Sequence, residues 1–73
     1  MKKDVAKRVL DVVFRQSGEL DELVRVLRKE ADNAEFLIYR QVVGEVLATF
    51  LTGIINPLVA EHEDLRPPGL NKV

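Results

Sequence analysis

The sequence predicts an all-α fold, in which a small helical hairpin is followed by a long third helix. Apolar residues recur every three or four positions along almost the whole chain, which is the spacing of amphipathic helices. The 73 residues are 47% hydrophobic and 32% charged and include no cysteine, a composition typical of a folded globular protein. We therefore expect one helical domain at residues 1–64 and an extended tail, containing Pro67 and Pro68, at residues 65–73.

The first helix is predicted at residues 4–16. Gly18 stands where a glycine commonly ends a helix, just past the last apolar position. The expected inward-facing residues share helical spacing: Val5, Val9, Val12, Val13 and Gln16, with Leu10 and Phe14 widening the stripe. This helix is also the basic part of the chain, because it follows Lys2 and Lys3 and carries Lys7, Arg8 and Arg15.

The second helix is predicted from residue 19 to about residue 31. Acidic residues open it, where they interact favourably with the positive end of the helix dipole. Its expected inward residues are again helically spaced: Leu20, Leu23, Val24, Leu27 and Ala31. Asp32 followed by Glu35 resembles a helix N-cap, so a new helix is expected to begin there. One long helix from residue 19 onward remains open as an alternative.

The third helix is predicted at residues 33–62, with a kink at Pro57. Its residues 46–60, VLATFLTGIINPLVA, carry no charge, and its polar residues fall on one narrow stripe. In one alternative the helix stops at Gly53 and a short new helix begins at Asn56 and Pro57. A helix that is apolar around most of its circumference must be covered on several sides.

The third helix is therefore expected to form the shared core of a helical-bundle homodimer. A chain this short buries little apolar surface, and without cysteine it has no disulfide to compensate, so oligomerisation is the expected stabiliser. Gly44 is expected to allow close approach of two helix backbones, against a second copy or against the first helix. The predicted interface residues are Tyr39, Val43, Gly44, Val46, Leu47, Phe50, Leu51, Ile54 and Leu58.

No catalytic, cofactor or metal site is predicted. The hydroxyl residues lie far in sequence from the only histidine, His62, and the glycines are scattered rather than gathered in a phosphate loop. His62 and the acids beside it, EHED at 61–64, lack the spacing that aims two ligands at one metal, and a solvated helix end explains them. The sequence thus predicts a non-enzymatic interaction or regulatory module.

The expected partner is a second copy of the chain, in a homodimer or a higher homo-oligomer, and another protein is left open. A small membrane-associated protein is the first alternative, disfavoured because the uncharged run is 15 residues whereas a span needs about 20. A dimer that binds nucleic acid through the basic first helix is the second, disfavoured because Asp4 and Asp11 share that face. The lack of cysteine and of a signal-peptide pattern predicts a cytoplasmic location.

Overall fold

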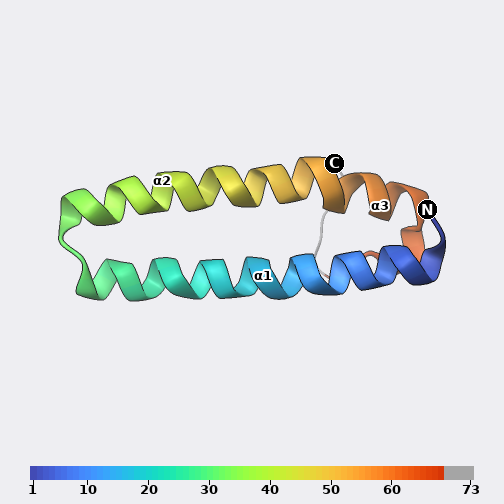
Figure 1. Cartoon of the computed structure of the whole chain (residues 1–73), viewed down its shortest axis with the longest axis horizontal. Helices are drawn as coiled ribbons and strands as arrows, with labels where there is room; N and C mark the ends of the chain where they lie inside the picture. Colours follow the sequence, from blue (N-terminus) through green and yellow to red (C-terminus); the bar gives the residue numbers. More distant parts are fainter. Residues whose placement is uncertain (69–73) are drawn as a thin grey trace.

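The all-α prediction is confirmed by a computed structural model, which describes residues 1–68 and contains no strand among them. Two long helical segments lie side by side and run in opposite directions (Figure 1). The first is α1, Lys3–Glu30. The second comprises α2, Asn33–Phe50, a π-helical turn at Leu51–Ile55, and α3, Asn56–Glu61. The Cα trace measures 44 × 20 × 19 Å.

The predicted break at Gly18 is wrong, because α1 continues through it and joins the two expected helices. A glycine inside a helix costs only about 1 kcal/mol relative to alanine. A regular apolar stripe crosses that position and outweighs this cost, since each of its residues packs toward the second segment. The stripe repeats in steps of three and four: Ala6, Leu10, Val13, Ser17, Leu20, Val24 and Leu27. The Ser17 hydroxyl donates to the Val13 carbonyl at 2.8 Å and is thereby satisfied within the helix.

The turn between the two segments is at Ala31 and Asp32, as the capping pattern predicts. The Asp32 carboxylate accepts a hydrogen bond from the Glu35 backbone N–H at 2.9 Å. This hydrogen bond holds the pKa of Asp32 below its ordinary value. Beside the turn, the Arg28 guanidinium lies 5.7 Å from the centre of the buried Phe36 ring, a cation–π contact between α1 and α2.

The second segment is helical from 33 to 61 but does not keep one phase through Pro57. Proline has no N–H and crowds the carbonyl four residues earlier. The turn before it widens, and the Asn56 N–H donates to the carbonyl of Leu51, five residues back. This extra residue moves the buried side of the segment, which passes from Phe50 to Ile55 and Val59.

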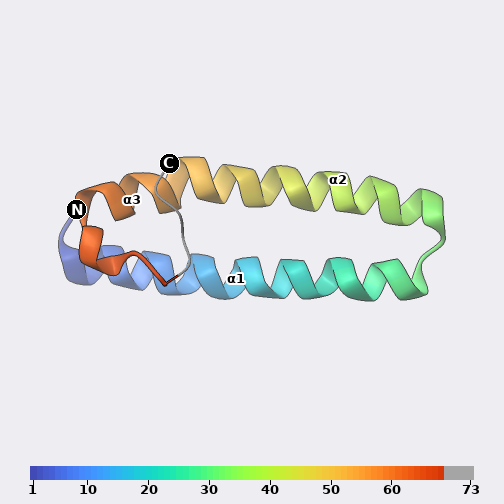
Figure 2. The same cartoon turned by 180° about the vertical axis from the view of Figure 1, so that it is seen from behind.

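The core is concentrated at the end of the molecule that contains α3. Its buried centre combines Leu10 and Val13 of α1 with Ile55 and Val59 of the second segment. Partly buried apolar residues surround this centre: Val9, Phe14, Phe50, Leu51, Ile54, Leu58 and Leu65. Leu65 belongs to a short 3₁₀ turn, Glu63–Leu65, which follows α3 and lies beside α1 (Figure 2). Residues 69–73 of the predicted tail lie outside the described residues.

Candidate functional site: an uncovered apolar face

One side of the helix pair is marked by charged residues along the seam between α1 and α2. Asp21 and Arg25 of α1 and Arg40 and Gly44 of α2 border a common hollow of about 320 Å³. These four residues therefore lie on the same side of the molecule. Because an α-helix turns about 100° per residue, a residue two positions farther along lies on nearly the opposite side. Leu23 of α1 and Val46 of α2 consequently share the other side.

That other side is apolar and uncovered. Val12 and Leu23 of α1 are 47% and 46% exposed, and Tyr39 and Val46 of α2 are 53% and 37% exposed. Their spacing, three helical turns on α1 and two on α2, forms one stripe along each helix. We call this surface the apolar face. It consists of Val5, Val12, Leu23 and Val26 of α1 and Tyr39, Val42 and Val46 of α2, with Ile38 at its outer edge.

The α1 half of this face corrects the predicted inward stripe of the first helix. Val5, Val12 and Gln16 were expected to face the core, but all three are exposed, whereas Leu10 is buried as expected and Ala6 is buried although it was not predicted. The two stripes are adjacent on the helix and both have helical spacing, so a pattern search alone does not separate them. Together they make α1 apolar over roughly half its circumference, a width that indicates a neighbour on each of two sides.

The predicted interface residues, all in the second segment, are divided among three environments. Tyr39 and Val46 lie on the apolar face, and Val43 is buried against α1. Gly44 is exposed on the charged side of the seam. The remaining ones are half-buried around the core: Leu47, Phe50, Leu51, Ile54 and Leu58. Sequence reasoning missed Val42 on α2, and it missed the exposed residues of α1, whose signal was the second apolar stripe.

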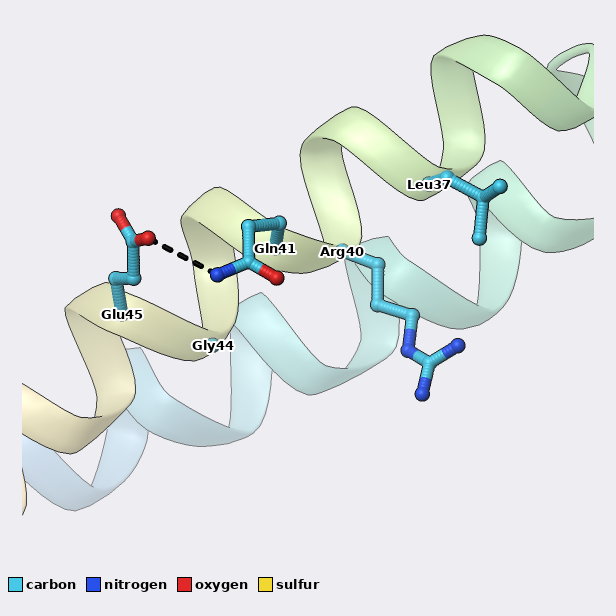
Figure 3. Close-up of a pocket in the computed structure, with 5 residues that line it drawn as sticks. All are labelled: Leu37, Arg40, Gln41, Gly44 and Glu45. Atoms are coloured by element: carbon cyan, nitrogen blue, oxygen red, sulfur yellow. Dashed lines mark hydrogen bonds between the residues drawn. The ribbon is translucent and has the colours of Figure 1, made fainter.

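A second hollow, beside Gly44 on α2, does not form a binding or catalytic site. It has a volume of about 590 Å³ and is bordered by Leu37, Arg40, Gln41, Gly44 and Glu45 (Figure 3). Leu37 and Arg40 point away from Gln41 and Glu45, and the Gln41 side-chain amide donates to the Glu45 carboxylate at 3.0 Å. These polar groups do not converge on a shared point where a small molecule would bind.

Gly44 also has no close neighbour within the chain. A Cβ atom added there would meet no heavy atom within 4 Å, so the expected close approach to α1 is absent. Gly44→Ala should then stabilise the fold by about 0.4 to 1 kcal/mol, because alanine lowers the entropy of the unfolded chain. Urea denaturation of variant and parent at one fixed protein concentration measures this. A loss of about 1 to 3 kcal/mol would instead show that a second copy packs its backbone against Gly44.

Ion pairs join the start of α1 to the end of α3. The Met1 ammonium lies 3.0 Å from the Glu61 carboxylate, and Lys3 pairs with Asp64. The hydrogen bond from the Met1 ammonium lowers the pKa of Glu61, and that from Lys3 lowers the pKa of Asp64. His62 Nε2 lies 2.8 Å from the Met1 carbonyl oxygen and 2.9 Å from Glu61 Oε1. Glu61 and Asp64 therefore bind the beginning of the chain, whereas Glu63 pairs with Arg66.

The described residues contain no group of three or more histidines and acids arranged to hold a metal. The basic groups of α1 are partly engaged: Lys7 lies 3.1 Å from Asp11, and Lys3 pairs with Asp64. This pairing reduces the positive surface that the nucleic-acid alternative would require.

The helical segment Asn33–Glu61 is long and apolar enough to cross a membrane. It has 29 residues, a mean hydropathy of 1.7 over its most apolar stretch, and only 17% of that stretch is buried. Core helices of soluble proteins also meet this criterion when a second layer covers them. Searches with protein-family models, curated proteins and solved structures gave no match to this chain.

Proposed function

We propose that this protein is a non-enzymatic self-association module, in which two copies bury their apolar faces against each other as a four-helix bundle. The observation that carries this proposal is the apolar face. A pair of helices with one apolar side and one charged side is half of such a bundle, because each helix then needs one further neighbour.

The area of exposed surface supports a partner of the same size. The chain exposes 5514 Å² of accessible surface. A compact monomer of 8.3 kDa is expected to expose about 4,600 Å². The excess is about 900 Å², and a stable protein–protein interface buries about 800 Å² on each partner. One face-to-face contact between two copies would therefore remove the excess.

The polar groups support a binding role rather than catalysis. The hydroxyls of Ser17, Thr49 and Thr52 each donate to a backbone carbonyl four residues earlier. None of them contacts a histidine or carboxylate that would activate it as a nucleophile. Thr52 belongs to the polar stripe of the second segment, which the proposed bundle leaves in solvent, and Thr49, seven residues after Val42, lies at the edge of the apolar face.

Sedimentation equilibrium without detergent tests the proposal. We expect a mass of twice 8.3 kDa at tens of micromolar, and a melting temperature that rises with protein concentration because the folded state is dimeric. A folded monomer at low micromolar concentration, with a melting temperature independent of concentration, would contradict the proposal.

A membrane-associated protein is the second candidate, favoured by the length and hydropathy of Asn33–Glu61. Arg40 and Glu45 oppose it, because a charge near the centre of a bilayer costs about 2.5 to 3.5 kcal/mol. Flotation with phosphatidylcholine vesicles separates the two candidates. A chain that needs detergent to stay in solution and floats with the vesicles is membrane-associated, whereas a soluble dimer that remains at the bottom of the gradient is not.

A further inference from the structure

Two polar residues, Gln16 and Glu19, interrupt the apolar face between Val12 and Leu23, and Gln16 is the uncharged one. It follows Val12 by one helical turn and is exposed. Its amide makes no hydrogen bond to another described residue, although amides that become buried normally find a partner. Since α1 runs from Lys3 to Glu30, Gln16 lies at the middle of this helix. Because Gln16 lies at the middle of α1, the residue that it meets in a dimer depends on the relative direction of the two copies.

Two symmetric arrangements bring two apolar faces together. If the twofold axis runs along the helices, α1 of one copy lies on α2 of the other, and both turns are at the same end. If the axis runs across the helices, α1 lies on α1 in the opposite direction, and each turn lies over the other copy's termini. Only the second arrangement, which we call end-reversed, places the middle of α1 against the middle of its copy.

The end-reversed arrangement gives Gln16 a partner. Two Gln16 side chains at the axis can donate and accept reciprocally through their amides. In the other arrangement Gln16 would face the middle of α2, close to Val46 and Leu47, and its amide would be buried among apolar groups. Burying an amide without a hydrogen bond costs about 1 to 3 kcal/mol in proteins.

Charge favours the same arrangement. The flanking residues Arg15 and Glu19 lie one turn apart on the exposed side of α1, and neither makes an ion pair with another described residue. End-reversed stacking places Arg15 of each copy near Glu19 of the other. The alternative brings the two turns together, so that Glu30 and Glu35, which lie on the stacked side seven residues from Leu23 and Val42, approach their counterparts and repel them.

We propose that the two copies stack end-reversed, with Gln16 as the residue that specifies this register. The inference rests on the proposed self-association and adds its orientation. In coiled coils a polar residue in an apolar helical seam has this effect, and it fixes alignment at some cost in stability. The partner is thus a second copy whose α1 runs antiparallel on α1.

Single-cysteine variants test the register, because the chain has no cysteine of its own. Gln16→Cys should form a disulfide with its counterpart under mild oxidation. Gln41→Cys is the matched control, since it replaces the same residue type at an exposed position on the outer polar stripe of α2. Non-reducing electrophoresis should show covalent dimer from Gln16→Cys at least about tenfold faster, because a disulfide requires Cα atoms within about 7 Å.

The outcome separates this inference from the proposed function. A chain that sediments as a dimer but cross-links equally at both positions has another register, and the inference is wrong while the self-association stands. A monomeric chain overturns both.

Charge exchange is the second measurement: Arg15→Glu and Glu19→Arg should each raise the dimer dissociation constant about tenfold, and the double variant should restore it. A double variant weaker than either single one would overturn the inference.

Discussion

Replacing Val46 with glutamate should abolish the dimer. Val46 lies near the middle of α2 on the apolar face and is 37% exposed in the single chain. A carboxylate there meets solvent in a monomer but would be buried in the proposed bundle, once in each copy. The effective penalty for burying an unpaired charge is several kcal/mol. The dissociation constant should therefore rise by at least about a thousandfold.

Ala48→Glu is the matched control for this variant. Ala48 is exposed, lies two residues along the same helix and therefore faces almost the opposite direction. Sedimentation and circular dichroism of both variants at the same concentration should show a dimer for Ala48→Glu. Val46→Glu should give a monomer with reduced helix content. A Val46→Glu chain with the parental mass and melting temperature would show that the apolar face is not the interface.

The sequence predicted the helical class and the boundary between the two segments because both depend on local chemistry. Asp32 caps α2 through a bond to a residue three positions away, so the information lies within one turn. The apolar character of the second segment was equally clear, since its uncharged run is continuous. These features need no knowledge of which helix packs against which.

The sequence did not predict correctly where a helix continues or which of its sides is buried. These features depend on contacts between separate parts of the chain. Gly18 has the chemistry of a helix end, but the apolar stripe that crosses it decides in favour of continuity. The helix continues through Pro57 as predicted, but the sequence did not predict that the turn before it widens and moves the buried side by one residue. Both outcomes depend on contacts made by residues at least one helical turn away. The helix propensity of Gly18 or Pro57 alone does not contain that information.

The candidate site was predicted only on α2, and the reason is the paired stripes of α1. Val5 and Val12 also have helical spacing, and valine is more apolar than alanine, so the sequence placed these two valines in the core with Leu10 and Val13 and left out Ala6. The structure assigns Ala6 to the core because its small side chain lets the helices approach. The larger valines are left to the apolar face, where the proposed second copy would cover them.

Replacing Leu10 with alanine tests the position of the buried core on α1. Leu10 is 2% exposed and belongs to the buried centre formed with Val13, Ile55 and Val59. Removing its side chain should leave a cavity and cost about 2 to 5 kcal/mol of the free energy of unfolding. For a domain of this size, each kcal/mol lowers the melting temperature by about 4 to 8 °C.

Leu37→Ala supplies the control, because it makes the same change at a leucine that is 49% exposed and lies beside the hollow at Gly44. Its expected cost is below about 0.5 kcal/mol, as for most surface substitutions. Both variants should be melted at one protein concentration, followed by circular dichroism. Equal losses at the two leucines would place Leu10 outside the core.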